Sequence, residues 1–243
     1  DGLVMDIKTG NGAFADNLDF ARNMGNCIIE VAKQFGMNTS AIITDMNQPL
    51  GGTVGNTLEI KEVIDYLKCV RQESRLHEVV LTLAAEMLAV AGIVDSTDEG
   101  FQKAKEVLNS GKAAETFEKM VSRLGGPNNI LENTNSHFES AYFVKPVQVH
   151  QSGFISQINT PAVGLTVVEL GGGRKKPSDS IDHSVGLSNV LGLGTKVNVG
   201  EPLAIVHAHN EDQANIAIQQ IQNSFIISEI KAKSNPLIIE YLN

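Results

Sequence analysis

The opening 44 residues hold the feature that most restricts the fold: two apolar runs of strand length separated by an amphipathic helix. Residues 3–7 and 40–44 are the two runs, and between them apolar side chains recur at helical spacing. Asp16 is predicted to cap the helix, with the acidic Asp19 in its first turn. A crossover of this length joins parallel strands, so the pattern predicts a βαβ unit in an α/β domain.

Helical patterns dominate the sequence from the second strand to residue 125. Helices are predicted over residues 56–68 and 75–91, followed by a third that Thr97 caps and a fourth after Gly111. The helix over 75–91 is apolar almost all round, which predicts a central position.

Composition changes near residue 126, which predicts a second domain. Residues 126–140 have the composition of a linker. Beyond them, residues 142–149 and 153–158 alternate as strands do, and helices are predicted near 161–169 and 211–225. We therefore expect three segments: an α/β domain over residues 1–125, the linker over 126–140 and a smaller α+β domain over 141–243.

Charge and composition limit the classes of partner. The chain has 19 Lys and Arg against 28 Asp and Glu, a net charge of −9, which argues against a general nucleic-acid surface. No apolar run approaches the roughly 20 residues that a membrane helix needs, and no signal peptide is visible. Cys27 and Cys69 lie in apolar helical stretches, so we expect buried free thiols in a reducing, cytoplasmic compartment.

Two glycine-bearing loops are candidate sites. Residues 8–14 follow the end of a strand, where ligands gather in open α/β sheets, although a plain βα turn explains the same pattern. Residues 45–55 form a longer connection than is usual. Loop carbonyl groups with the carboxylate of Glu59 or Glu62 suit a cation, whereas two solvated glutamates are the alternative.

Two further patterns concern anions and metals. Residues 171–176 place three cations after three glycines, which suits either an anion grip or a solvated basic hairpin but is not a P-loop. His207 and His209 lie on one face of a predicted strand. Zinc would need further ligands at a recognised spacing, so structural or surface histidines are favoured.

Together these segments resemble a known family. Several long stretches, in order and with few gaps, are similar to thymidine and pyrimidine-nucleoside phosphorylases; the first two read LVMDIKTGNGAF and TDMNQPLG. The stretches cover residues 3–14, 44–51, 54–62, 171–174, 179–186 and 200–208. The resemblance implies an α/β domain with a mixed sheet flanked by helices, followed by a smaller α+β C-terminal domain with a hammerhead-like, β-rich region.

The resemblance also implies a reaction. Phosphate, as co-substrate, attacks C1′ of a pyrimidine deoxynucleoside and gives the free base and 2-deoxyribose 1-phosphate, with no organic cofactor. Oxocarbenium character in the transition state would leave most of the catalysis to positioning and electrostatic stabilisation.

Part of the site carries over residue by residue. By the resemblance, Phe14 lines the pyrimidine pocket and Gly12 belongs to a loop that closes the cleft. Some members hold a structural potassium ion through loop carbonyls and one glutamate, which here would be Leu50, Thr53 and Glu62.

The phosphate-gripping and base-holding segments of the family lie upstream of the aligned start, so no catalytic residue is expected in this chain. The chain also begins without Met, inside a predicted strand. We therefore expect an incomplete part of a homodimeric enzyme, inactive by itself, without nucleic-acid or membrane partners.

Two alternatives stay open. The Gly-Glu-Pro-Leu pattern near residue 200 is similar to biotinyl and lipoyl domains and would suit a non-catalytic scaffold or interaction module, although no Met-Lys-Met turn is present. A relative of the anthranilate phosphoribosyltransferases would need magnesium and a diphosphate substrate. Within the family, thymidine is the expected substrate, and whether uridine is also accepted is left open.

Overall fold

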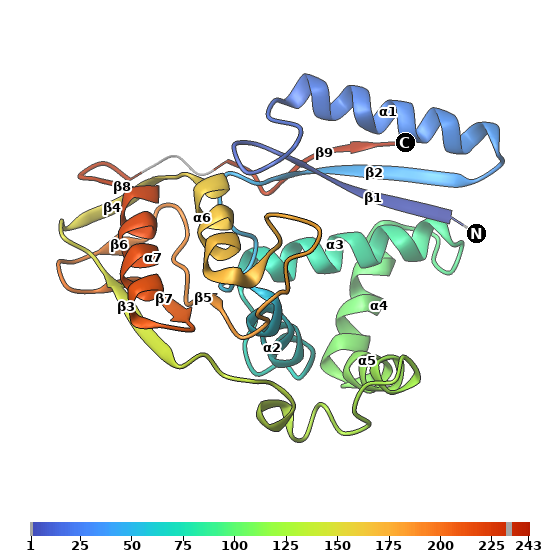
Figure 1. Cartoon of the computed structure of the whole chain (residues 1–243). Helices are drawn as coiled ribbons and strands as arrows, with labels where there is room; N and C mark the ends of the chain where they lie inside the picture. Colours follow the sequence, from blue (N-terminus) through green and yellow to red (C-terminus); the bar gives the residue numbers. More distant parts are fainter. Residues whose placement is uncertain (1, 232–234) are drawn as a thin grey trace. The chain divides into compact units, whose positions relative to one another are not determined.

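The computed structural model describes residues 2–231 and 235–243, which fold into two compact units (Figure 1). The first unit comprises Asp1–Asn47, Leu67–Glu115 and Asn235–Asn243, and the second comprises Gln48–Tyr66 and Thr116–Ser234. These units interleave along the chain, whereas the predicted domains are contiguous segments. The predicted boundaries at residues 125 and 141 stay a prediction.

A three-stranded mixed sheet forms the centre of the first unit, in the order β1-β2-β9. Its strands are β1 (Gly2–Thr9), β2 (Asn38–Asp45) and β9 (Ile238–Leu242). Strands β1 and β2 are parallel and pair from Gly2–Asn38 to Thr9–Asp45, whereas β9 runs antiparallel to β2. The βαβ unit and the mixed sheet are therefore confirmed, while the pairing of β9 with β2 was not predicted.

Helices cover both faces of this sheet (Figure 1). The helices of this part of the chain are α1 (Leu18–Gln34), α3 (Ser74–Val90) and α4 (Thr97–Asn109). Helix α1 approaches the sheet closely because its buried positions are small: a Cβ atom added at Gly25 would meet Leu242 Cδ1 at 2.5 Å and Ile7 Cδ1 at 2.9 Å. The core beneath it is formed by Ile7, Ala15, Ala21, Ala41 and Ile43.

Two small antiparallel sheets build the second unit, with strand orders β3-β7-β5 and β6-β4-β8. Their strands are β3 (Phe143–Gln148), β4 (Gly153–Ile158), β5 (Gly186–Ser188), β6 (Lys196–Val197), β7 (Pro202–Ala208) and β8 (Phe225–Ser228). The other elements outside the first unit's core are α2 (Asn56–Leu67), α5 (Lys112–Arg123), η1 (Thr134–His137), α6 (Thr160–Val167), η2 (Val168–Gly172) and α7 (Glu211–Ser224). This arrangement confirms the α+β character of the C-terminal part.

Helix α7 packs against α6 and against β3 and β7, and a continuous apolar core fills the space between the sheets and these helices. Its fully buried members include Val147, Ile155, Leu187, Val206 and Ile221. No helix in the described part of the chain is long and apolar enough to cross a membrane.

Two helix caps are displaced by one residue from the prediction. Asn17, not Asp16, caps α1, and its side-chain oxygen accepts the Phe20 N–H at 2.9 Å. Ser96, not Thr97, caps α4 and accepts the Glu99 N–H. In both cases the cap is the residue directly before the first helical residue, so the prediction was one residue too early for α1 and one residue too late for α4.

The prediction of buried cysteines was wrong, since Cys27 and Cys69 are both exposed free thiols. Cys27 lies on the face of α1 that points away from the small residues packed on the sheet. Cys69 follows α2 with φ of +56°, and its Sγ lies 3.7 Å from the Leu108 carbonyl oxygen.

Candidate functional site

The glycine loop, residues 10–14, leaves the C-terminal end of β1 and is tied to the residues that leave β2. Gly12 N donates to the Met46 carbonyl oxygen at 3.0 Å, and Ala13 N donates to the Gly10 carbonyl oxygen at 3.0 Å. Gly10 has φ of +117°, which favours glycine. The loop therefore has a defined shape at the strand end where ligands gather in open α/β sheets.

Phe14, the predicted base-pocket residue, is 86% exposed at the end of this loop. Its ring lies 5.8 Å from that of Phe20, centroid to centroid and tilted by 51°. A phenylalanine this exposed offers apolar area to a ligand or to another surface.

A buried ion pair supports the same strand end. Arg75 Nη2 of α3 lies 3.1 Å from Asp45 Oδ2 and also donates to the Asp45 carbonyl oxygen at 3.2 Å. Asp45 is 2% exposed. Sequence reasoning missed this pair because its members lie 30 residues apart and no local pattern connects them.

Asn47 connects the ion pair to the glycine loop. Its Nδ2 donates to Asp45 Oδ1 at 2.6 Å, and its Oδ1 accepts Asn11 N at 3.0 Å and Asn11 Nδ2 at 3.2 Å. Hydrogen bonds therefore run without interruption from Arg75 to the loop backbone. Asn47 lies in the candidate loop of residues 45–55, but no role was predicted for its side chain.

Lys8, at the start of the predicted loop, is already paired. Its Nζ contacts the Asp6 carboxylate and donates to Thr44 Oγ1 at 2.9 Å, while Thr44 Oγ1 donates to Asp6 Oδ1 at 2.6 Å. The three side chains bridge β1 and β2 on one face of the sheet, and their charges balance.

The two glutamates of α2 both reach back to the preceding loop. Glu62 Oε1 accepts Gly52 N at 2.7 Å, and Glu62 Oε2 accepts the Thr53 hydroxyl at 2.5 Å. Glu59 Oε1 accepts Gly55 N at 2.9 Å, next to the first turn of the helix. Glu59 thus satisfies a helix terminus, whereas Glu62 places its carboxylate on the loop that contains Leu50 and Thr53.

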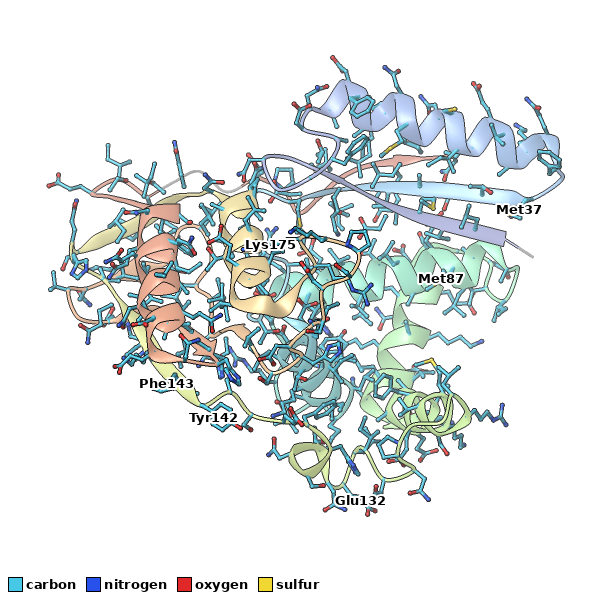
Figure 2. All side chains as sticks on the ribbon, in the orientation of Figure 1. Met37, Met87, Glu132, Tyr142, Phe143 and Lys175 are labelled. Atoms are coloured by element: carbon cyan, nitrogen blue, oxygen red, sulfur yellow. The ribbon has the colours of Figure 1, made fainter. Side chains whose placement is uncertain are left out.

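The basic segment of residues 171–176, in which Lys175 is labelled in Figure 2, binds the carboxylate of the nearby Asp179. Asp179 Oδ2 accepts the main-chain N–H groups of Lys175 and Lys176 at 3.1 and 2.9 Å, and Arg174 Nε donates to the Asp179 carbonyl oxygen. Two main-chain N–H groups of the segment are therefore bound by its own carboxylate, which favours the basic hairpin.

The two histidines of the β7 region have different partners. His207 Nε2 shares a hydrogen bond with Ser188 Oγ at 2.8 Å, whereas His209 Nδ1 lies 3.7 Å from Asp182 Oδ2 and its ring meets that of Tyr142 edge-on. Among the described residues, no group of three or more His, Cys, Asp or Glu side chains is placed to hold a metal ion.

His207 is half-buried, and this burial lowers the pKa of its imidazole. The positive charge of Lys61 lowers the same pKa further. In the unfolded chain the imidazole has its ordinary pKa of about 6.5, so it binds a proton at a higher pH than in the folded chain. The free energy of unfolding therefore decreases as the pH falls from about 6.5 to the lower pKa of the folded state. We expect His207→Asn to flatten the pH dependence of the unfolding free energy below about pH 6.5. Urea denaturation across this range measures the slope, and an unchanged slope would contradict the assignment.

An open cavity with a volume of about 1020 Å³ lies within the second unit. Its lining includes Glu59, Asp182, His183, His209 and Tyr142, the last labelled in Figure 2. Its lining residues do not include Gly12, Phe14, Leu50, Thr53 or Glu62, so the cavity and the predicted site residues are separate features.

Two family models match the chain. Residues 1–114 match the glycosyl transferase family a/b domain, and residues 154–228 match the pyrimidine nucleoside phosphorylase C-terminal domain. The first match contains the glycine loop and the loop before α2, and the second contains most of the two antiparallel sheets.

Two curated relatives are similar over nearly the whole chain. Thymidine phosphorylase of Colwellia psychrerythraea is 45% identical over 238 residues, which are 98% of this chain and 54% of the relative. Thymidine phosphorylase of Agrobacterium fabrum is 43% identical over 227 residues, which are 93% of this chain and 52% of the relative. The chain therefore spans about half the length of the curated relatives it matches.

Proposed function

This chain belongs to the thymidine and pyrimidine-nucleoside phosphorylase family, and on that premise we propose that its residues serve the phosphorolysis of thymidine. The observation that carries the proposal is the glycine loop at the end of β1, which presents the exposed Phe14 at the ligand-binding edge of a parallel strand pair. The proposed enzyme is a pentosyltransferase that uses inorganic phosphate as co-substrate.

In the proposed reaction a phosphate oxygen forms a bond to C1′ of the deoxyribose as the C1′–N1 bond breaks. The pyrimidine leaves with the electron pair of that bond and takes up a proton, and the other product is 2-deoxyribose 1-phosphate. No residue of this chain is assigned to the catalytic step. Gly12 and Phe14 are proposed to bind and enclose the base, which contributes orientation.

Replacing Phe14 by alanine in the full-length gene product is expected to raise KM for thymidine roughly 10-fold, because a pyrimidine ring would lose an aromatic contact surface. KM for phosphate is expected to stay within about 2-fold, since the phenyl ring offers no anion contact. The loss of nucleoside absorbance during phosphorolysis measures both constants.

Phe35→Ala is the matched control, because Phe35 is 84% exposed at the far end of α1. It is expected to leave both constants unchanged. Equal increases in the two constants for Phe14→Ala would point to collapse of the loop, and an inactive full-length enzyme would refute the proposed function and leave the scaffold alternative.

We also propose a structural potassium ion held by the carbonyl oxygens of Leu50 and Thr53 and by Glu62. The donor set fits the ion, because potassium sites in proteins are built from oxygen atoms that replace its hydration shell. The Glu62 carboxylate already lies on the loop, against Gly52 N and the Thr53 hydroxyl. The ion would fix the loop and balance the glutamate charge.

Glu62→Gln is expected to abolish stabilisation by potassium. For the full-length enzyme we expect the Tm in potassium chloride to exceed that in sodium chloride by about 2–4 °C, as for a linkage effect near 1 kcal/mol. The variant should melt at the same temperature in both salts. Glu59→Gln, which removes a helix-terminus contact from the same helix, should keep the difference.

The proposed enzyme also has an expected cellular location and oligomeric state. We propose a cytoplasmic homodimer, which family membership and the exposed free thiols of Cys27 and Cys69 support. Sedimentation analysis of the full-length product tests the dimer. Thymidine is the proposed substrate, and parallel assays with uridine measure how broad the specificity is.

A further inference from the structure

We propose that Asn47 is a positioning residue, which holds the glycine loop in the conformation that presents Phe14 to the pyrimidine. This inference rests on the proposed function. In this proposal the Asn47 side chain contacts the loop and no substrate atom, so Asn47 affects the reaction only through the conformation of the loop.

Asn47 has a rigid support. Asp45, which is 2% exposed, is bound by Arg75 through both its carboxylate and its main-chain carbonyl oxygen, at 3.1 and 3.2 Å. The carboxylate in turn accepts Asn47 Nδ2 at 2.6 Å and faces Asn47 N at 3.4 Å. Hydrogen bonds to a charged and buried acceptor are stronger than neutral ones, so the amide has one fixed orientation.

Only an amide at position 47 satisfies both of its neighbours, Asp45 and Asn11. Asn47 donates through Nδ2 to the Asp45 carboxylate and accepts through Oδ1 from Asn11 N and Asn11 Nδ2. An aspartate at this position would keep the acceptor but lose the donor, and would place a second negative charge against Asp45.

The backbone of the glycine loop lies directly on the Asn47 amide. A Cβ atom added at Gly10 would come within 2.8 Å of Asn47 Nδ2, Cγ and Oδ1. With Gly12 N bound to the Met46 carbonyl oxygen, the loop is attached at two points to the residues that follow β2. Both attachments precede Phe14, so they set where its ring projects.

The Phe14 side chain has few contacts of its own. Its ring is 86% exposed, and the ring contact it makes is with Phe20, itself 42% exposed. Loss of the Asn47 contacts would therefore release the loop and the ring together, at a cost in orientation when the base binds.

Asn47→Ala in the full-length gene product is expected to raise KM for thymidine about 10-fold, with KM for phosphate within about 2-fold, because a lost hydrogen-bond set of this kind corresponds to about one decade. Asn38→Ala is the matched control: Asn38 begins the same strand, and its Nδ2 donates to the Val90 carbonyl oxygen at 3.1 Å. The control should leave both constants unchanged. Equal changes in the two constants for Asn47→Ala would overturn the proposal.

Asn47→Asp tests the proposal through the pH dependence of kcat/KM, which a purely structural role of Asn47 would not change. At pH 8 the new carboxylate repels Asp45, and kcat/KM for thymidine should fall at least about 10-fold below that of the unaltered enzyme. At pH 5.5 protonation of the introduced carboxylate restores a donor, and the deficit should shrink to roughly 3-fold or less. A deficit that is independent of pH would overturn the proposal.

Hydrogen exchange separates failure of this inference from failure of the proposed function. In Asn47→Ala, amide exchange of the peptide that contains residues 10–14 should be at least about 10-fold faster than in the unaltered protein, and exchange in Asn38→Ala should be normal there. Unchanged exchange would refute the attachment of the loop. Faster exchange in a protein that does not split thymidine would support the attachment and refute the function.

Discussion

Replacing Arg75 by methionine is expected to lower the free energy of unfolding by about 3 kcal/mol, because the buried Asp45 carboxylate loses its charged partner. Methionine keeps much of the apolar stem of arginine and removes its charge. Asp45 would then be left as a buried carboxylate with only the amide donors of Asn47 near it. Urea denaturation followed by circular dichroism measures the change.

A double variant shows whether the cost arises from the abandoned carboxylate. Asp45→Asn combined with Arg75→Met should be more stable than Arg75→Met by itself, because the pair is then replaced by neutral groups. Arg22→Met is the control, since Arg22 pairs with Glu240 at a more exposed position than Arg75, where salt bridges contribute less. A loss below about 1 kcal/mol for Arg75→Met would mean that Asp45 remains solvated.

Gly186→Ala is expected to lower the free energy of unfolding by about 3 kcal/mol or more, through two causes that add. Gly186 has φ of +148°, where a side chain is strained, and an added Cβ atom would lie 2.3 Å from the Val54 carbonyl oxygen and 3.1 Å from Gly55 Cα. Both neighbours are main-chain atoms, so neither can rotate away as a side chain would.

Gly200→Ala separates these causes, because Gly200 has φ of +86° and no heavy atom within 4 Å of an added Cβ. It should lose only about 1–2 kcal/mol, the cost of the backbone conformation. Equal losses for the two variants would show that the contact at Val54 relaxes freely. Since Val54 pairs with Leu187 next to the proposed potassium loop, Gly186→Ala should also reduce the stabilisation by potassium.

Local patterns in the sequence were sufficient for most helices and strands. The helix predicted over residues 75–91 is α3 at Ser74–Val90, and the strand predicted over 153–158 is β4 at Gly153–Ile158. The helices were found because period and capping act over neighbouring residues. Placement of the two cysteines failed because apolar composition near a residue does not reveal which side of the helix it occupies.

The candidate site was predicted only where a motif marked it. Phe14 came from the family resemblance, whereas Glu62 was already a candidate cation ligand from its spacing and was selected over Glu59 by the resemblance. The structure places the Glu62 carboxylate on the predicted loop, while both binding roles remain predictions. Asn47 and Arg75 were not predicted, because their contacts join residues 36 and 30 positions apart in the chain. The pairing of β9 with β2 escaped prediction for the same reason, since Tyr241 opposite Ile42 has no local signal.

The interleaving of the two units has a consequence for how this chain folds. The chain passes from one unit to the other after Asn47, Tyr66 and Glu115, and once more before Asn235. Strand β9 completes the sheet of the first unit by pairing with β2, although β2 ends at Asp45 and β9 begins only at Ile238. Such distant pairing carries a high contact order, which slows folding. Refolding should therefore show β2–β9 contacts among the last to form, and neither unit is a single continuous segment that can be expressed by itself.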